Sequence, residues 1–538
     1  MAKRGIATTA AVVLAIVTLV IGLGIGLVVY PIVFPGLQAR VTQLEADVAQ
    51  KQATITQLQA QVTSLQANVT SSQATITQLQ AQVTSLQANV TSSQATITQL
   101  RARVAQLEAD VAQKQATIRS IQGNMSSLLT ELRAALITKL PADLQSKYFA
   151  TRLNLTGPQK IGAIMSMSGD LASYGENEKT AAELAVSEVN AILLAAGETW
   201  YVELVVEDTQ TKPDICLQKV ESLNARGIKL LVGPLSSGEV GAIMSYCNAE
   251  KILAISQSST APALAADDYI YRYCPNDMWQ GKAIGRLMWS SGIKYVVPTW
   301  RGDAWGDGLV NSGKQRFEAL GGIFSQDVVR YSTVVTPDFS IEAATLNTIV
   351  TNALATYPAN QVAVWALSFG EIAAYMSQAQ SYPNLAKVVW YGSDGTVNEP
   401  ALINPAAPLI SAFAAKTNFT NPIFAPARTT KYDKVNAYIW QKLGREPDSY
   451  SYNIYDMIWA YAYSLLVTGK YDSAAVRAVF PDVTRSIYGA VGWVDFDDNG
   501  DRKPTDYDLW RVVPAEAGKY KWLYVGKWSL ATDSVEWL

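Results

Sequence analysis

Three polar segments, each placed where a predicted strand ends, offer the groups that would bind a charged small molecule. The run Ser236–Glu239 opens a predicted helix with capping-box spacing, and the free N–H groups of a helix start favour an anion such as a carboxylate. The run Ser258–Thr260 ends the next strand and adds hydroxyl and amide donors. Asp394 ends a strand in the second half of the chain and supplies a carboxylate. Donors on one side and an anion on the other suit an α-amino acid zwitterion.

These residues also have plainer interpretations. Ser236 and Ser237 could serve only as N-caps of the helix that they open. Asp394 stands in a Gly-Ser-Asp-Gly sequence that is typical of a turn. Its position at the carboxyl end of a strand favours ligand binding, because ligands of open α/β sheets bind at that edge.

The composition argues against several other functions. The 538 residues include no histidine, which removes Ser-His-Asp and Cys-His catalysis and the commonest zinc ligand. The formal net charge of −3 argues against nucleic-acid binding, which needs a basic surface. We therefore expect a protein that is not an enzyme, uses no cofactor and binds no nucleic acid.

One acidic segment resembles part of a calcium-binding loop. It follows the pattern Asp-x-Asp-x-Asn-Gly with an aspartate at the twelfth position, and its candidate metal ligands are Asp495, Asp497, Asn499 and Asp506. The flanking residues read as strands rather than helices, and an aspartate replaces the bidentate glutamate. A tight hairpin turn is therefore favoured over a calcium site, and no other metal site is expected.

The three cysteines leave two redox states open. Cys216, Cys247 and Cys274 form no C-x-x-C motif, so neither a thioredoxin-like motif nor a zinc motif is indicated. One disulfide with one free thiol, and three buried reduced thiols, are equally favoured.

From about residue 158 the chain alternates strands and helices, which is typical of doubly wound parallel sheets. The predicted strands are 160–167, 201–207, 229–232, 252–256, 295–297, 362–366 and 387–391, and the helices between them are 176–193, 213–226, 240–249 and stretches ending at 320 and 380. Two such sets predict two Rossmann-like lobes with a cleft between them. The lobes would hinge about crossover segments near Pro275–Met278, Glu399 and Pro426–Thr430.

Several segments of this region resemble the leucine/isoleucine/valine-binding family of type I periplasmic solute-binding proteins, which feed ABC importers. In the family's order they are IGAIMSMSGDLASYGENEKTAAELAVSEVNA (161–191), LLVGPLSSGEV (230–240), AISQSSTAPAL (254–264), AWGDGL (304–309) and WYGSDG (390–395). GAVGWVDFDDNGDR (489–502) resembles the family's late β-hairpin. The resemblance covers about 156–538 and implies an α/β fold of the type I periplasmic binding protein class.

The resemblance also implies roles for single residues. It places Asp394 against the ammonium group of a ligand, and three hydroxyl residues, Ser237, Ser259 and Thr260, on its carboxylate. Aromatic positions of the family's cleft match Tyr174, Trp305 and Phe369, which could equally be core residues. The pair Ser258-Ser259 replaces small apolar residues and makes the pocket more polar, which disfavours a branched aliphatic ligand and leaves amides, urea-like compounds and polar amino acids open. The predicted ligand-binding set is Tyr174, Ser236, Ser237, Ser258, Ser259, Thr260, Trp305, Phe369 and Asp394.

A coiled-coil stalk is predicted over residues 37–138. Fourteen heptads run without interruption from Val41 to Ala135, with valine or isoleucine at the first twelve a positions and leucine at eight of the fourteen d positions. This pattern is typical of parallel helices that supercoil, here about 140 Å tall. Residues 55–75 recur unchanged as 76–96, and the third d position of each 21-residue unit is polar. The pattern favours a parallel homodimer, with a trimer as the alternative.

The N-terminal segment reads as a membrane anchor. Residues 6–34 form an apolar run longer than the roughly 20 residues that span a bilayer, and Lys3 and Arg4 precede it. Residues 1–5 would then be cytoplasmic, and the stalk, a linker (139–157) and the two-lobed domain (158–538) extracellular, in a single-pass membrane protein. Cleavage after Gly5, as in type IV pilin-like leaders, would keep the apolar helix. Five sequons agree with an external location: Asn68, Asn89, Asn124, Asn154 and Asn418.

Two functions remain after these exclusions. In the first, a surface-tethered protein captures an amino acid or amide and passes it to an ABC permease. In the second, the chain is a structural surface-layer or spacer glycoprotein whose binding-protein-like head is a scaffold, which the tall stalk favours. A signalling receptor is disfavoured, because about five cytoplasmic residues cannot form a signal domain. The candidate ligand groups in both lobes favour capture, while the ligand's identity and the importer stay open.

Overall fold

The computed structural model describes residues 35–137, 155–333 and 338–538, and the chain divides into two units, Met1–Ser120 and Ile121–Leu538. Within these described ranges, no helix is both long and apolar enough to cross a bilayer. The predicted membrane segment 6–34 and most of the predicted linker lie outside them. The anchor therefore stays a prediction.

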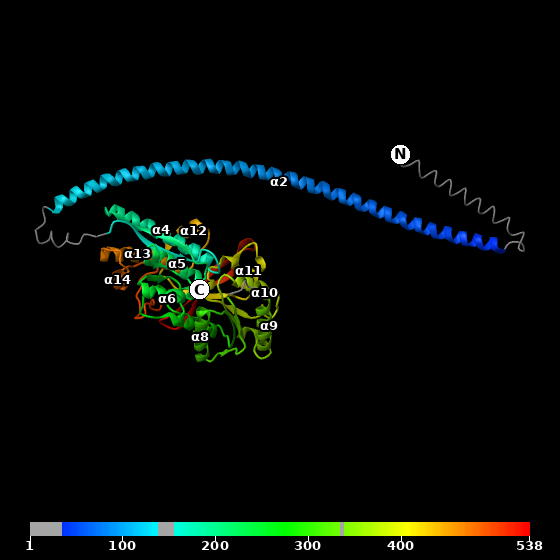
Figure 1. Ribbon diagram of the computed structural model, residues 1–538. Helices are drawn as coiled ribbons and strands as arrows, with labels where there is room; N and C mark the ends of the chain where they lie inside the picture. Colours follow the sequence, from blue (N-terminus) through cyan, green and yellow to red (C-terminus); the bar gives the residue numbers. More distant parts are fainter. Residues whose placement is uncertain (1–34, 138–154, 334–337) are drawn as a thin grey trace. The chain divides into compact units, whose positions relative to one another are not determined.

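The predicted stalk is one unbroken helix, α2 (Pro35–Ile137), of 103 residues (Figure 1). In the single chain its apolar seam is exposed, with Leu58 at 53% and Leu65 at 62% of full exposure. An apolar stripe of this length needs a partner, because exposed a and d side chains give a long helix no packing stability. The helix is observed, and pairing with further copies of the chain stays a prediction.

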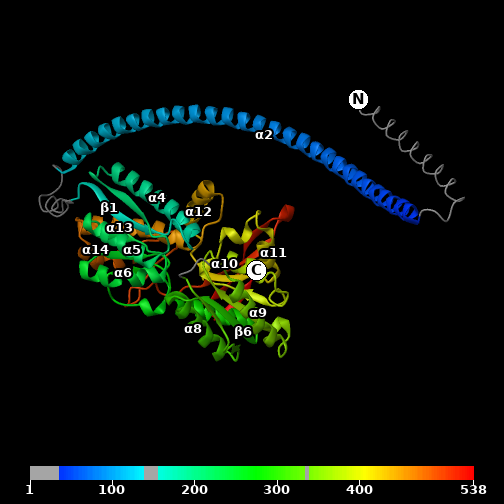
Figure 2. The same ribbon diagram turned by 45° about the vertical axis from the view of Figure 1, so that its right-hand side comes forward.

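The second unit holds two α/β lobes (Figures 1 and 2). Lobe one is built on a five-stranded parallel sheet of order β2-β1-β3-β4-β5. Its strands are β1 (Gly157–Met165), β2 (Trp200–Asp208), β3 (Leu230–Val232), β4 (Leu253–Ser256) and β5 (Ile270–Arg272). Each strand predicted in this region is present within a few residues of its predicted bounds.

Helices cover both faces of the lobe-one sheet. They are α4 (Ala172–Ala195), α5 (Pro213–Ala225), α6 (Ser237–Glu250), α12 (Thr430–Leu443), α13 (Tyr450–Thr468) and α14 (Ser473–Arg485), with a 3-10 turn η1 (Pro262–Leu264). Helices α4 and α13 pack together on one face, and α5 and α6 pack on the other. All three cysteines are buried free thiols, and Cys216 and Cys247 lie under the second face. The structure therefore has three reduced thiols rather than one disulfide and one free thiol.

Lobe two is built on a mixed nine-stranded sheet. Its path is β14-β13-β12-β11-β10-β9-β6-β7, with β8 also paired to β6, and strands β12 to β14 are antiparallel to their neighbours. The strands are β6 (Tyr295–Arg301), β7 (Ile323–Phe324), β8 (Val329–Tyr331), β9 (Val362–Leu367), β10 (Val389–Tyr391), β11 (Thr420–Phe424), β12 (Tyr507–Pro514), β13 (Tyr520–Ser529) and β14 (Ser534–Trp537).

The lobe-two sheet is also covered on both faces. Its helices are α7 (Asp277–Ser290), α8 (Ala304–Ala319), α9 (Ser340–Leu354), α10 (Ile372–Ala379) and α11 (Pro408–Lys416), and its 3-10 turns are η2 (Ala359–Gln361), η3 (Asp394–Thr396), η4 (Pro400–Ile403) and η5 (Glu516–Gly518). Helices α7 and α8 pack as a pair on one face, and α9 to α11 build a separate core on the other.

The chain crosses between the lobes three times. The first crossing lies between β5 and α7 and the second between β11 and α12, where Pro275–Met278 and Pro426–Thr430 were expected. The expectation for Glu399 is wrong, because this residue lies within lobe two as the N-cap of η4. The third crossing is the segment between α14 and β12.

This third crossing contains the calcium-like segment and the predicted late β-hairpin. It forms no regular strand, and within it isolated bridges join Gly489 to Gly492 and Phe496 to Arg502. Asp495 pairs with Arg485 and Lys503, while Asp497 Oδ1 accepts hydrogen bonds from the backbone N–H groups of Asn499 and Asp501. Asp506 lies further along and accepts from the N–H of Leu530. The acidic side chains therefore order a turn, and within the described residues no group of three or more acidic or cysteine side chains is arranged to hold a metal ion.

A buried ion pair joins the end of β5, where the first crossing begins, to the third crossing. Arg272 Nε and Nη2 each donate to one oxygen of Asp501 at 2.5 Å, and both side chains are 2% exposed. The backbone adds two hydrogen bonds, from Arg272 N to Gly500 O and from Arg502 N to Arg272 O, both 2.9 Å. A bidentate pair of this kind aligns two interlobe segments, and losing one partner leaves a buried charge without compensation.

We therefore expect Asp501→Ala to lower the free energy of unfolding by about 3–5 kcal/mol. Every tryptophan of the chain lies at or beyond Trp200, so tryptophan fluorescence during denaturant unfolding of the full chain reports on the lobes alone. Asp498→Ala is the control, because Asp498 is an exposed aspartate of the same turn. Equal midpoints for the two variants would contradict a structural role for the ion pair.

Candidate functional site

The carboxyl ends of the parallel strands in both lobes meet at one cavity. From lobe one, the segments after β1, β3 and β4 contribute, and from lobe two, those after β6, β9 and β10. The lining residues are Leu171, Tyr174, Leu235, Ser236, Ser237, Ser258, Trp305, Phe369, Asp394, Gly395 and Tyr450. Seven of the nine residues predicted from the sequence therefore line one cavity. The other two, Ser259 and Thr260, lie directly behind its wall.

The start of α6 forms the donor side of the cavity. Ser236 is the N-cap: its N–H and Oγ–H donate to Glu239 Oε2 at 3.0 and 2.6 Å, and Glu239 N–H donates back to Ser236 Oγ at 3.3 Å. The capping-box prediction is thus confirmed. The N–H groups of the first helical residues, Ser237 and Gly238, have no carbonyl to bond within the helix, so this end of α6 suits an anion.

Ser237 is a hydrogen-bond hub rather than a cap. Its Oγ accepts from the N–H groups of Thr260 and Ala261, at 3.2 and 3.1 Å, and from Ser259 Oγ at 3.1 Å. Because these donors occupy its oxygen, Ser237 can contribute only its hydroxyl hydrogen, as a donor, to a ligand in the cavity. Ser259 and Thr260 thus act on the cavity through Ser237, and Thr260 Oγ1 donates to Asp277.

Asp394 forms the acidic side of the cavity. Its carboxylate is 3% exposed, and Oδ2 accepts a 2.5 Å hydrogen bond from the hydroxyl of Tyr450. Oδ1 has no hydrogen-bond partner among the described residues. Burial raises the pKa of Asp394 to about 6, and the Tyr450 hydrogen bond opposes this shift. A buried carboxylate oxygen without a donor marks the place where a cation would bind.

Of the aromatic residues that line the cavity, Tyr174 joins the lobes, while Trp305 and Phe369 lie together in lobe two. The Tyr174 hydroxyl lies 2.7 Å from the carbonyl oxygens of both Asp394 and Val397, across the lobe boundary. A Cβ on the next residue, Gly175, would lie 2.0 Å from Ser166 O, so this glycine lets the first turn of α4 pack on the end of β1. Trp305 and Phe369 are in contact with ring centroids 4.7 Å apart and ring planes tilted by 33°.

The cavity is nearly closed by direct contacts between the lobes. Ser173 Oγ donates to Glu399 Oε2 at 2.8 Å, and Arg301 Nη1 lies 3.4 Å from Asp170 Oδ2. The space in and around the cavity that no protein atom fills, open solvent included, is about 310 Å³, and the centre of a water molecule can occupy about 20 Å³ of it. This is room for about one water. A ligand of several heavy atoms enters only when the lobes separate or side chains move.

Four lining residues were absent from the sequence prediction. Leu235 and Gly395 are chain neighbours of predicted residues and could have been included on that ground. Leu171 lies in the loop between β1 and α4. Tyr450 begins α13, in the segment that returns to lobe one, and no local motif marks it.

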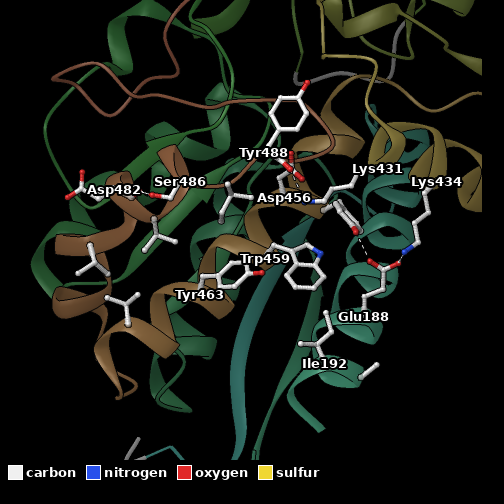
Figure 3. Close-up of a pocket in the computed structure, with 16 residues that line it drawn as sticks. Glu188, Ile192, Lys431, Lys434, Asp456, Trp459, Tyr463, Asp482, Ser486 and Tyr488 are labelled. Atoms are coloured by element: carbon white, nitrogen blue, oxygen red, sulfur yellow. Dashed lines mark hydrogen bonds and ion pairs between the residues drawn. The ribbon is translucent and has the colours of Figure 1, made fainter. Parts of the chain in front are cut away.

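A second, larger hollow lies within lobe one, away from the predicted residues. It has a volume of about 1100 Å³ between α4, α12, α13 and α14, with Trp459 and Tyr463 of α13 exposed toward it (Figure 3). Its charged groups bond one another or the backbone: Lys434 pairs with Glu188, and Lys431 donates to Tyr488 O at 2.7 Å. Because its lining is mainly apolar and its charges are paired, it lacks the convergent polar groups of the interlobe cavity.

The chain matches a protein family described as the receptor family ligand binding region over residues 177–515. An uncharacterized protein of Methanocaldococcus jannaschii is 32% identical over 397 residues, which cover 70% of this chain and 91% of that protein. The Leu/Ile/Val-binding protein of Escherichia coli is 32% identical over 110 residues, 20% of this chain and 29% of that protein.

A crystal structure shares the fold. The branched-chain amino acid transporter substrate binding protein LivJ of Streptococcus pneumoniae, in complex with isoleucine, superposes with a TM-score of 0.55 at 21% identity. The match covers 68% of this chain and 99% of that one.

The buried Asp394 carboxyl should make stability depend on pH. Because its pKa is raised from 3.8 to about 6 in the folded state, this carboxyl contributes stability that is lost as the pH rises from about 4 to about 6, by about 3 kcal/mol in total. Asp394→Asn lacks this group, so the difference between the two unfolding free energies should change over that pH window. The measurement is denaturant unfolding by tryptophan fluorescence, with Asp498→Asn as the control. A difference that is constant across the window would contradict the burial argument.

Proposed function

The chain belongs to the receptor ligand-binding-region family of type I periplasmic binding proteins, and on that premise we propose that it captures an amino acid or a related amide for an ABC-type importer. In this role it binds its ligand without chemical change and uses no cofactor. The observation that carries the proposal is the opposition of two groups across one cavity: the open start of α6 and the unpartnered Oδ1 of Asp394.

The two ends of a zwitterion fit these groups. A ligand carboxylate would accept hydrogen bonds from the first N–H groups of α6 and from the Ser237 hydroxyl. A ligand ammonium would donate to Asp394 Oδ1, with the second oxygen held by Tyr450. Because Asp394 and α6 belong to different lobes, a ligand that binds both also holds the lobes together.

The side-chain part of the cavity favours a small ligand. The two serines that made the pocket look more polar are engaged internally, since Ser258 Oγ donates to Leu235 O at 2.8 Å and Ser259 Oγ to Ser237. The walls left for a ligand side chain include Trp305 and Phe369. The space in the closed state is small, which fits a compact amino acid or amide better than a long chain.

The same proposal includes the cell-surface attachment. Residues 6–34 would anchor the chain in the membrane with the N-terminus cytoplasmic, and α2 would form the extracellular parallel stalk of a homodimer or homotrimer. Of the glycosylation candidates, Asn68, Asn89 and Asn418 are exposed. Asn154 and the side chain of Asn124 lie outside the described parts of the chain.

A structural surface protein is the alternative. The observation in its favour is the length of α2, which at 1.5 Å per residue is roughly 150 Å and would hold the lobes far from a membrane-embedded permease. In this case the interlobe cavity would bind no solute, which the following experiment decides.

We expect a panel of amino acids, amides and urea to contain at least one compound that raises the unfolding temperature of the lobes. A ligand that binds only the folded state raises the free energy of unfolding by RT ln(1 + [L]/Kd), so a micromolar binder adds about 4 kcal/mol at millimolar concentration.

Asp394→Ala should weaken binding of a zwitterion by about 30-fold or more, equivalent to about 2 kcal/mol. Wild-type affinity should also fall about tenfold per pH unit below about 6, because protonation removes the charge that pairs the ammonium.

Asp498→Ala is the matched control and should bind as the wild type does. A panel without any shift would favour the structural alternative. Binding that survives unchanged in Asp394→Ala would keep solute capture but overturn the site assignment.

The stalk gives a separate prediction. In detergent, the full chain should have the mass of a dimer or trimer by light scattering, and Leu65→Lys with Leu86→Lys should shift it toward the monomer, because both residues occupy d positions. The control places the same charges on the outer f positions, with Ala67→Lys and Ala88→Lys, and should keep the oligomer. A monomeric wild-type chain would refute the coiled coil.

A further inference from the structure

Two buried polar side chains lie behind the lobe-one wall of the cavity. Glu178 is on α4, one turn after Tyr174, and Gln257 follows β4 directly before Ser258. Both are fully buried, with no exposed surface. They therefore connect the helix that carries Tyr174 with the segment that carries Ser258, the two parts of lobe one that line the cavity.

The two side chains share one hydrogen bond, and each keeps one unsatisfied oxygen. Gln257 Nε2 donates to Glu178 Oε2 at 2.7 Å. The remaining oxygens, Glu178 Oε1 and Gln257 Oε1, have no hydrogen-bond partner among the described residues. An ionised carboxylate is an acceptor only, so it cannot satisfy the amide oxygen. Two orphan acceptors on two groups already in contact are unusual in a buried site.

One proton would satisfy both oxygens. A protonated Glu178 has an O–H on Oε1 that can donate to Gln257 Oε1, while Gln257 Nε2 keeps donating to Oε2. A carboxylic acid and a primary amide then form a reciprocal pair with two parallel hydrogen bonds. Asn453 Nδ2 donates to the Gln257 backbone carbonyl at 2.7 Å and so holds the backbone from which the amide side chain extends.

The electrostatic surroundings also favour the neutral acid. The charged groups that act on Glu178 are Asp448, from the loop before α13, and Glu239, from α6, and both are acids. Tyr174 is the titratable neighbour on α4 itself and is buried. Burial first, and then the repulsion by Asp448, raise the pKa of Glu178 well above its usual value, against the opposing Gln257 hydrogen bond.

We propose that Glu178 is a neutral carboxylic acid at physiological pH and that its reciprocal hydrogen-bond pair with Gln257 positions the two lobe-one walls of the ligand cavity. Glu178 is a positioning residue, because it does not line the cavity itself. The pair fixes Tyr174, whose hydroxyl reaches across to Asp394 O, relative to Ser258. The pairing is a property of the folded lobe and does not require that the chain binds any solute.

Glu178→Gln tests the proton directly, because glutamine imitates the neutral acid and can keep both hydrogen bonds with Gln257. In the full chain, unfolding of the lobes is followed by tryptophan fluorescence between pH 4 and pH 8. At the acid end the two proteins should have similar unfolding constants. With rising pH the wild-type unfolding constant should increase relative to the variant by up to tenfold per pH unit, from about pH 4.5 to the pKa of the folded state, because only the unfolded wild type releases the proton.

A second measurement reads the proton without unfolding. Infrared spectroscopy at pH 7 should show a carbonyl-stretch band of a protonated carboxylic acid in the wild type that is missing from Glu178→Gln. Glu183→Gln is the matched control: Glu183 is on the same helix, exposed and paired with Lys179 at 2.7 Å, and this variant should keep the band and the wild-type pH profile.

Two results would overturn the proposal. The first is a ratio of unfolding constants, wild type to Glu178→Gln, that does not change with pH. The second is identical carboxylic-acid bands in the two proteins. Neither readout uses a ligand, so a failed ligand panel leaves this proposal standing, and a failure here leaves solute capture untouched.

Discussion

Parallel strands bring all of their carboxyl ends to one edge of a sheet, and in this protein the two sheets turn those edges toward each other. Every group of the candidate site depends on this arrangement. The α6 start and Ser237 follow strands of lobe one, Asp394 follows a strand of lobe two, and neither side is complete alone. The Tyr174 hydroxyl donates a 2.7 Å hydrogen bond to the carbonyl oxygen of Asp394, and this bond directly connects the lobe-one and lobe-two parts of the site. The hinge segments matter because they set how these halves meet, and the Arg272–Asp501 pair ties two of them together.

Buried aspartates have different kinds of partners at the hinge and around the cavity. At the hinge, a buried aspartate has a bidentate arginine, which compensates its desolvation. Around the cavity the buried acids Asp394, Asp277 and Asp448 are held mainly by hydroxyls, amides and backbone N–H groups. Burial raises the pKa values of all three, and the neighbouring Asp394 charge raises that of Asp277 further. A cation from outside is therefore worth more at Asp394, the acid that lines the cavity, than at an exposed carboxylate.

Local signals in the sequence predicted most of lobe one and the core of lobe two, because strand-helix alternation and strand-end motifs depend on residues near in sequence. The capping box at Ser236 is such a signal, and it is confirmed by three hydrogen bonds. The return of α12 to α14 to lobe one, the antiparallel strands β12 to β14 and the third crossing were not predicted, because they depend on pairing between distant segments. Tyr450 was missed for the same reason, since it meets Asp394 from 56 positions away. The Ser258 hydroxyl shows a different kind of error. The residue type predicted a polar group for the ligand, but the hydroxyl donates to Leu235 O instead.

The closed arrangement raises the question of what a ligand would add to it. Several interlobe bonds already exist without one, including Ser173 to Glu399 and Arg301 to Asp170. A ligand shifts an opening equilibrium only by its difference in affinity for the two states. In an open state, bulk water can reach Asp394 Oδ1 and the first N–H groups of α6, whereas in the closed state Oδ1 is buried and has no donor among the described residues. A ligand that donates to Oδ1 therefore satisfies a buried acceptor that the closed lobes leave without a protein donor. If the chain captures a solute as proposed, this contact supplies a difference in affinity between the open and closed states.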